Sequence, residues 1–450
     1  MKTIANAISY EKVTRVYLYL MIIGYLLFTG LQGYNYLTTT KFLYFSCCTV
    51  VWFLLLFCIC FKEGRQIKME QRDLWILLFL LACCLSTALS SQASFLSLDT
   101  GRYEGLFTWL MYGVILFFVS KFGVPHTRYL YVFAAAYGFC CAVALLQLMG
   151  KNPLWLYLGT WNYYSPFIQE SGAFLGTLGN VDVFSALHCL ALPLFLSAAV
   201  HLKSRTRFLL LFPVALGLLC VLLARVSSGI LALAVTIFLY APQWADQGLF
   251  SAGIPDYCIR KKIRLILRIV LIGILFLFLL LVYFLPPPTG TLYELYRILH
   301  GDIQDHFGSH RILIWRKALL IISEHPVLGI GPDCSLEYFN ICFSKYSDVF
   351  EEVLYRYVDN AHNEYLQLLI NFGLVGCFPL FVFLCRTLWL IFRNSDYTVL
   401  KIMSPGFICY LIQAFFNIGS SIVVPFFLIL WGMLLRAQDD AQLLSKGSAC

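Results

Sequence analysis

The feature that most constrains this chain is a succession of apolar runs, most of them about 16 to 22 residues long. A helix of about 20 apolar residues crosses a hydrocarbon core about 30 Å thick. Hydrophobic residues make up 60% of the 450 positions and charged residues only 12%, which is about half the charged share of a soluble domain. The sequence therefore predicts an all-α integral membrane protein with many spans.

The apolar runs predict about twelve transmembrane helices. No small-residue cleavage site follows the first run, so we expect it to be retained as a helix. The expected spans lie near 16–33, 42–61, 74–91, 107–121, 129–149, 182–201, 208–224, 229–241, 265–285, 363–391, 398–417 and 420–436.

Lysine and arginine residues in the short loops predict the orientation of the spans. With the N-terminus inside, 22 of the 32 basic residues face the cytoplasm, and an even number of spans places both termini there. The formal net charge of +8 reflects this bias and indicates no nucleic-acid partner. Four regions are expected: transmembrane helices in 1–285, a large outward loop over 286–361, three further spans in 362–436 and a cytoplasmic tail over 437–450.

Ten basic residues remain on the predicted outer side, against the insertion rule, and are therefore candidates for function. They are Lys41, Arg102, Lys151, Arg225, Arg297, Arg311, Arg316, Lys317, Lys345 and Arg356. Three outward segments are long, at 91–105, 151–180 and 286–361. In the third, the helical spacing of Ile312, Trp315, Leu319 and Ile322 predicts an amphipathic helix over 309–323 that lies along the membrane surface.

Cysteine and histidine patterns give only weak indications. Most of the seventeen cysteines fall inside spans, where they behave as small apolar residues; Cys334 and Cys342 lie outside and either pair or stay free. His306 and His310, with Asp302, form at most an incomplete metal-ligand set. No nucleotide-binding glycine motif is visible, so neither a metal nor a cofactor is predicted.

Two outward arginines lie where a phosphate group of a lipid would reach them. Arg311 lies on the predicted amphipathic helix, and Arg225 lies where two spans meet at the outer surface. Guanidinium groups hold phosphate oxygens in a bidentate way. The alternative is that both side chains only extend toward lipid head groups.

A polar segment, 359–367, runs directly into a predicted span and contains His362. A neutral imidazole at this boundary can accept a proton from a hydroxyl group. The alternative is a purely structural helix start, in which Asn360 or Asn363 caps free backbone N–H groups that themselves favour an anion. Outward carboxylates are numerous, but no spacing singles out a pair of the kind a retaining glycosidase needs. They are Glu104, Glu170, Asp182, Glu324, Asp333, Glu337, Asp348, Glu351, Glu352, Asp359 and Glu364.

Several of these residues together resemble the O-antigen ligase and O-antigen polymerase superfamily, from about 102 to 433. The similarity is carried by Arg311 with Trp315, by the segments 324–332, 361–367 and 373–376, by Gly179-Asn180 before a span that ends in Leu192-Pro193-Leu194, and by Asn417 and Pro425. The resemblance implies a GT-C-like polytopic glycosyltransferase. Such enzymes move a glycan from undecaprenyl pyrophosphate to an acceptor hydroxyl at the outer face of the bacterial cytoplasmic membrane, without nucleotide or metal.

The resemblance also implies roles for individual residues. Arg311 would hold the pyrophosphate, and His362 would act on the acceptor hydroxyl. The family's second arginine usually lies in a Ser-Arg-Gly motif, which reads Ser227-Ser228-Gly229 here, so Arg225 is expected to substitute for it. Supporting roles are expected for Asn363, Glu364, Tyr365, Trp315 and Arg102.

The expected partners are a lipid-linked glycan donor, a glycan, lipid or protein acceptor, and the membrane lipids. We favour a polymerase over a ligase, although the sequence barely separates the two. A flippase for lipid-linked sugars and a non-catalytic subunit of an envelope complex are the alternatives. Transport is disfavoured because the predicted spans are nearly free of charge.

Overall fold

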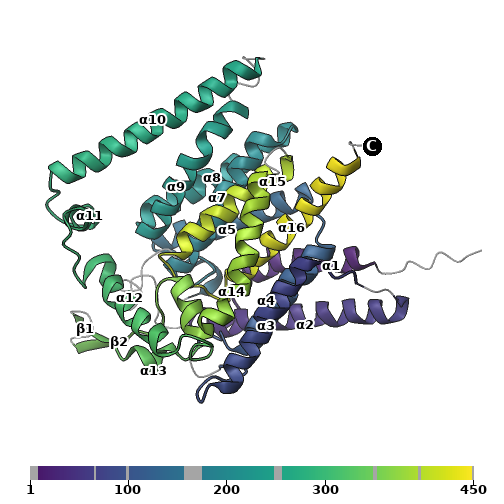
Figure 1. The fold of residues 1–450 in the computed structure, drawn as a ribbon, viewed down its shortest axis with the longest axis horizontal. Helices are drawn as coiled ribbons and strands as arrows, with labels where there is room; N and C mark the ends of the chain where they lie inside the picture. Colours follow the sequence, from purple (N-terminus) through teal and green to yellow (C-terminus); the bar gives the residue numbers. More distant parts are fainter. Residues whose placement is uncertain are drawn as a thin grey trace, which may run out of the picture.

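The computed structural model describes residues 9–64, 67–97, 101–156, 175–247, 256–347, 352–393 and 397–447. Within them, eight helical segments are long and apolar enough to cross a membrane (Figure 1). They are α2 (Leu37–Glu63), α3 (Gln71–Leu89), α5 (Thr127–Leu148), α7 (Val181–His201), Arg205–Ala224 including α8 (Leu211–Ala224), α9 (Ser227–Ala245), α10 (Tyr257–Phe284) and α14 (Glu364–Arg393). The polytopic membrane class is thereby confirmed, and the count of twelve stays a prediction.

Further helices complete the bundle. Two are shorter and apolar, α4 (Leu106–Phe122) and α15 (Thr398–Ala414). The first predicted span begins as α1 (Tyr10–Tyr19) and continues as a π-helix over Leu20–Tyr25. The last is α16 (Val424–Gly447), and short 3₁₀ turns cover Gly33–Tyr36, Pro153–Trp155 and Arg205–Leu210.

The bundle is densest around α7 and loosest around α10. Of the most apolar part of α7, 89% is buried against protein, whereas the corresponding figure for α10 is 6%. A Cβ at Gly406 of α15 would lie 2.5 Å from the carbonyl oxygen of Leu190 in α7, so a glycine lets these two helices approach closely. Helix α10 instead lies along one edge of the molecule (Figure 1), as expected of a helix that faces lipid.

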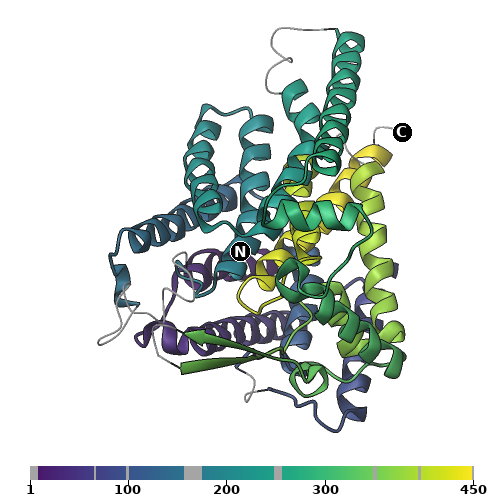
Figure 2. The ribbon, with the colours of Figure 1, turned by 90° about the vertical axis from the view of Figure 1, so that its left-hand side faces the viewer.

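The segment 286–361 is structured and not a simple loop. It contains α11 (Thr291–Leu299), α12 (Phe307–Glu324), α13 (Ser335–Phe339) and an antiparallel hairpin of β1 (Cys342–Ser347) and β2 (Glu352–Tyr357), visible in Figure 2. The all-α prediction is wrong for this hairpin. Val353, Tyr355 and Tyr357 alternate along β2, and such residues favour strands outside the apolar bundle.

Helix α12 confirms the helical prediction from Arg311 onward, whereas Ser309 and His310 have left-handed backbone conformations (φ 58° and 67°). Its buried face differs in part from the predicted one, because Trp315 and Ile322 pack against the buried cluster only at its edge. Its buried residues are Ile314, Ala318 and Ile321, whereas Leu319 is 57% exposed. The buried face packs against the segments around Ile330 and Ile370. The choice of face follows protein contacts, which the spacing of apolar residues alone does not reveal.

Helix α14 is interrupted at Gly373, where the backbone is non-helical (φ 64°, ψ −173°). The 326–331 turn fills this interruption: Ile330 and Gly331 donate to the carbonyls of Ile370 and Asn371, while Leu374 and Val375 donate to those of Pro326 and Val327. All four backbone bonds measure 2.8–3.1 Å. Groups freed by breaking a helix at membrane depth are thus satisfied by another backbone segment.

We call the contact between the 326–331 turn and the interruption of α14 the junction at Gly373. Both segments require a glycine there. A Cβ at Gly329 would lie 2.3 Å from the carbonyl oxygen of Ile370, and one at Gly373 would lie 2.3 Å from that of Val327. Both residues also have a positive φ, 68° and 64°, which favours glycine. The junction fixes the segment that follows α12 to the middle of α14.

Candidate functional site

The structure brings Arg311 and His362 together through a neighbouring tryptophan. Trp315 Nε1, one turn after Arg311 on α12, donates a 3.0 Å hydrogen bond to the carbonyl oxygen of Ala361. His362 follows directly, and the charge of Arg311 acts on its imidazole. Trp315 therefore has a clear positioning role between two segments far apart in the sequence.

His362 lies in a tight polar turn just before α14. Asn360 Oδ1 accepts from the backbone N–H of His362, and Asn363 Oδ1 accepts from those of Tyr365 and Leu366, all at 2.9–3.0 Å. Of the two asparagines expected as alternatives, Asn363 caps α14, and Asn360 instead closes the turn that precedes the helix. His362 itself has φ 49°, a conformation that non-glycine residues adopt mainly where function or packing demands it.

The imidazole of His362 is neutral at physiological pH. Burial, followed by the charges of Arg311 and Arg102, lowers its pKa to about 4, and Asp359 partly opposes them. Its Nδ1 is buried and has no hydrogen-bond partner among the described residues. A ring nitrogen is thus left for an external group.

The guanidinium of Arg311 also has nitrogen atoms that donate no hydrogen bond to a described residue. One terminal nitrogen donates to the carbonyl oxygen of Gly308 at 2.9 Å, and the buried Nε has no partner within the described ranges. Burial lowers the pKa of Arg311 and the nearby Asp182 carboxylate raises it. The guanidinium still keeps its charge, as arginine does in proteins, and so offers free donors to an anion.

Arg102, expected in a supporting role, forms a bidentate ion pair with Asp359. The distances are 2.6 Å from Nε to Oδ2 and 2.7 Å from a terminal nitrogen to Oδ1. The pair places one positive and one negative charge beside the imidazole of His362. Asp359 thereby joins the site, although the sequence did not distinguish it from the other outward carboxylates.

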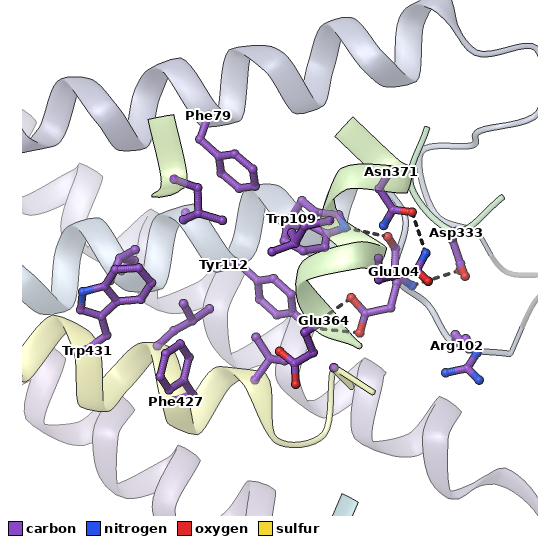
Figure 3. A pocket seen from close by; sticks show the side chains of 18 of the residues that line it. Phe79, Arg102, Glu104, Trp109, Tyr112, Asp333, Glu364, Asn371, Phe427 and Trp431 are labelled. Atoms are coloured by element: carbon purple, nitrogen blue, oxygen red, sulfur yellow. Dashed lines mark hydrogen bonds between the residues drawn. The ribbon is translucent and has the colours of Figure 1, made fainter. Parts of the chain in front are cut away.

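Two cavities meet at this ion pair. A polar cavity is lined by Asn180 and Asp182, among others. A deeper cavity runs between α3, α4, α14 and α16 as far as Trp431 (Figure 3). Arg102, Glu104, Asp359 and Gly419 line both.

Glu104, which precedes α4, and Glu364, at the start of α14, bring two carboxyl groups to the deeper cavity (Figure 3). The Tyr112 hydroxyl donates to Glu104 at 3.2 Å, and the Tyr410 hydroxyl donates to Glu364 at 3.1 Å. Burial, followed by the charge of Asp333, raises the pKa of Glu104 to about 8. Glu104 is therefore largely protonated at neutral pH and adds little negative charge.

The remaining supporting residues link α14 to its neighbours. The Tyr365 hydroxyl donates to the carbonyl oxygen of Leu411 at 2.7 Å. Asn417 Nδ2 donates at 2.9 Å to the carbonyl oxygen of Asp182, whose helix begins with Asn180 as its cap. These bonds hold the start of α14 and the start of α7 near the same part of the site.

Arg225 lies at the same end of the bundle but is exposed. It ends α8 in the left-handed conformation, with φ 55°, and no hydrogen bond or ion pair involves its side chain in the described structure. A Cβ at Gly229 would lie 2.1 Å from Ser185 Oγ, one turn after Asp182, so the start of α9 adjoins the start of α7. The structure does not bring Arg225 into contact with Arg311.

Other outward basic residues have structural partners. Lys41 Nζ donates to the carbonyls of Tyr25, Leu26 and Phe28 and so caps the end of the π-helix. Arg316 pairs with Asp305 at 3.0 Å on the surface, and Arg297 pairs with Asp302. The side chains of Lys345 and Arg356 lie outside the described residues.

The weaker sequence hypotheses do not form sites. Asp302 contacts Arg297 and Gln304, and no three histidine, cysteine or acidic side chains in the described parts of the chain are grouped to hold a metal ion. Cys334 is buried and Cys342 exposed, both as free thiols. Of the candidate carboxylates, Glu170, Asp348 and Glu351 lie outside the described residues, as does the side chain of Glu352.

Comparison with known families agrees with this geometry. Residues 212–381 match the model of a family described as O-antigen ligase. The matched segment includes Arg225, Arg311, Trp315 and His362, together with both halves of the junction at Gly373. No curated protein matches the chain. The resemblance seen in the sequence is confirmed, and over residues 212–381 this chain is similar to the O-antigen ligase family.

Proposed function

We propose that this protein is a membrane glycosyltransferase of the O-antigen ligase or polymerase type. It transfers a glycan from undecaprenyl pyrophosphate to an acceptor hydroxyl. The site faces the outer side of the bacterial cytoplasmic membrane, the termini face the cytoplasm and the fold is GT-C-like. Between the two reaction types, we favour the polymerase.

The observation that carries the proposal is the pairing of Arg311 with His362 by the Trp315–Ala361 hydrogen bond. Arg311 lies near enough to His362 for its charge to lower the pKa of the imidazole, and each side chain has a buried nitrogen without a hydrogen-bond partner among the described residues. This combination suits a reaction that releases a pyrophosphate while a hydroxyl loses its proton.

The proposed reaction is a single displacement at the anomeric carbon. The acceptor oxygen forms the new bond as its proton passes to the free nitrogen of His362. The bond between the anomeric carbon and the pyrophosphate oxygen breaks, and its electron pair leaves with the pyrophosphate. Arg311, assisted by Arg225, stabilises the charge on this leaving group. Attack opposite the leaving group inverts the anomeric centre.

The low pKa of His362 fits this reaction when the donor is bound. A pKa of about 4 in the free protein keeps the ring neutral, but it also makes the ring a weak base. A bound pyrophosphate offsets the charge of Arg311, one of the groups that lower this pKa, and therefore raises it. The donor would thus strengthen the base that acts on the acceptor.

Transport is less well supported. An interrupted helix such as α14 is common in transporters, where freed backbone groups bind ions. Here the four freed groups around Gly373 are already bonded to the 326–331 turn. The interruption therefore joins α14 to the 326–331 turn, and these four backbone groups are not available to bind an ion.

The test uses purified protein in detergent with an undecaprenyl-pyrophosphate oligosaccharide. Wild type is compared with His362→Gln, which keeps a polar side chain of similar size. We expect release of undecaprenyl pyrophosphate and glycan products of increasing length from wild type only. A single transfer to an added acceptor would indicate a ligase. Equal donor turnover by both proteins would exclude His362 as the base, and vectorial movement of the donor without cleavage would replace the proposal with transport.

A further inference from the structure

A further apolar cavity lies at the end of the bundle away from His362. It is enclosed by α5, α7, α15 and α16, with Ile22 of the π-helix completing its wall. Its mouth is formed by Pro125, His126 and Thr127, which follow the opposite end of α4 from Glu104. None of its lining residues lines either cavity at the Arg102–Asp359 pair, so the proposed reaction gives this cavity no role.

The shaft below this mouth is apolar. Along α16 it runs from Met433 to Phe426, which is about 10 Å at 1.5 Å per residue and roughly a third of the hydrocarbon core. The cavity encloses about 130 Å³, and apolar cavities of about this size take up hydrocarbons and not water. Its walls include the buried side chains of Phe133, Leu190, Leu194, Phe426 and Leu430.

The mouth, in contrast, carries positive charge. Arg128 is exposed in the first turn of α5, and the charge of Arg15, exposed on α1, acts on the hydroxyl of Tyr129, which lines the cavity. Neither arginine forms an ion pair with a described residue, and no carboxylate is among the described residues that line the cavity. His126 Nδ1 accepts from the backbone N–H of Arg128 at 3.0 Å, which leaves Nε2 of the neutral ring as a donor.

We infer that this cavity binds one acyl chain of an anionic phospholipid, whose phosphate lies against Arg128 and Arg15. The shaft alone would accept a chain of any lipid. The mouth selects the headgroup, because guanidinium groups hold phosphate oxygens in a bidentate way and basic residues beside a membrane attract anionic lipids. The bound lipid fills the space between α5, α15 and α16 at the end of the bundle opposite His362. The site is separate from the reaction centre, so its test does not depend on the proposed activity.

Two leucines on α16 provide a matched pair for the test. Leu430 lines this cavity, whereas Leu428 lines the deeper cavity against α3 and α4. Their exposed fractions are 6% and 7%. Leu430→Trp would fill the shaft, and Leu428→Trp makes the same change on the same helix outside it.

The experiment titrates delipidated full-length protein with phosphatidylglycerol, which is anionic, or with zwitterionic phosphatidylcholine of the same chain length. Native mass spectrometry measures the Kd of the first lipid bound. In wild type we expect phosphatidylglycerol to bind on the order of tenfold more tightly. Leu430→Trp should weaken binding of both lipids by about tenfold or more, because each methylene group that is no longer buried costs roughly fourfold in affinity. Leu428→Trp should keep the wild-type values.

The headgroup is tested at the mouth. Arg128→Gln should weaken phosphatidylglycerol binding by about fivefold and leave phosphatidylcholine binding unchanged. Arg268→Gln, at an exposed position of α10, is the control and should change neither. Glycerol phosphate, which has the charged group without acyl chains, should not compete with the lipid. Competition by it would assign the mouth to a free phosphate and overturn the inference.

Three further results would overturn the inference. Equal wild-type affinities for the two phospholipids would remove the role of the charged mouth without any variant. Equal effects of both tryptophans would mean general loss of packing. The third comes from wild-type protein and phosphatidylglycerol with a photoreactive diazirine at the end of one chain, which should label the lining residues of α5 or α16. Label confined to α10 would place the lipid on the outer surface of the bundle, even if Leu430→Trp did not fold.

Discussion

The two ends of the helical bundle treat charge in opposite ways. At the end away from His362, Lys121 Nζ lies 2.7 Å from Asp73, and Arg72 lies 2.8 Å from Asp439 and 3.1 Å from Glu70. These pairs join α3, α4 and α16 with one another. At the site end, neither Arg311 nor His362 forms an ion pair with a described residue, and the Nε of Arg311 and the Nδ1 of His362 have no hydrogen-bond partner there. Charge neutralised by neighbours stabilises the fold, whereas charge left partly unpaired is available to a substrate.

The largest loss of stability is expected from a change at Asp73, which is fully buried at the end of the bundle away from His362. Asp73→Asn leaves Lys121 without its closest partner, and removing one member of a buried pair costs about 3–5 kcal/mol. We expect a marked fall in the thermal midpoint in detergent, with transfer per folded molecule unchanged. Asp305→Asn, at an exposed pair with Arg316, is the control and should cost about 1 kcal/mol or less. Equal losses from both would contradict the structural role of the buried pair.

At the site end the expected loss is in activity and not in stability. Arg311→Lys keeps the charge but loses the planar fork of donors, and we expect kcat/KM to fall by on the order of 10²-fold. Arg316→Lys, five residues later on the same helix, should change it by less than about twofold. Both variants should keep the wild-type thermal midpoint. Full activity of Arg311→Lys would show that only charge is needed.

A change at Gly373, where the 326–331 turn meets the interruption of α14, should affect both stability and activity. Gly373→Ala would put a Cβ 2.3 Å from the Val327 carbonyl oxygen at a positive φ, and should cost roughly 1–3 kcal/mol. It should also lower transfer, because the junction holds α12 against α14. Gly273 in α10 has nothing within 4 Å of a Cβ, so Gly273→Ala should be neutral or slightly stabilising. Thermal midpoints and initial rates of both variants measure the difference.

The smallest effects are expected in the pH dependence. Because the pKa of His362 is about 4, kcat/KM should rise with pH through that value and stay level through neutrality. Arg102→Gln removes a charge that lowers the pKa and should move this acid limb to higher pH. Asp359→Asn removes a charge that raises it and should move the limb to lower pH, each by on the order of one unit or less. Shifts in the same direction would exclude direct electrostatic action of the pair on His362.

The sequence predicted the membrane class from apolar run length and a helix that includes Arg311. It also singled out Arg311, Trp315 and His362 from their chemical type and from the family resemblance, and their roles stay predictions. Lys41 and Arg316 were also candidates because they are basic residues on the predicted outer side, but the structure gives both of them structural partners. Arginine and lysine positions alone do not distinguish a substrate-binding cation from a paired one.

The tertiary partners were not predictable from the sequence. Asp359, Asp182 and Glu104 looked like ordinary outward carboxylates, because their significance comes from elements distant along the chain. Arg102 and Asp359 are 257 positions apart. The interruption of α14 was also hidden, because a glycine within an apolar run is compatible with a continuous membrane helix. Gly329 and Gly331 did not reveal that the backbone around them would complete the hydrogen bonds of another helix.

The junction at Gly373 and the Trp315–Ala361 bond together determine which part of this protein can change in length. They attach the chain on both sides of the 332–360 stretch, which contains the β-hairpin, and the backbone bond from Val358 to Ile341 closes that hairpin at its base. Changes in hairpin length or composition therefore need not alter the spacing between Arg311 and His362. The hairpin is thus a part of the protein that can change without moving Arg311 and His362 relative to each other.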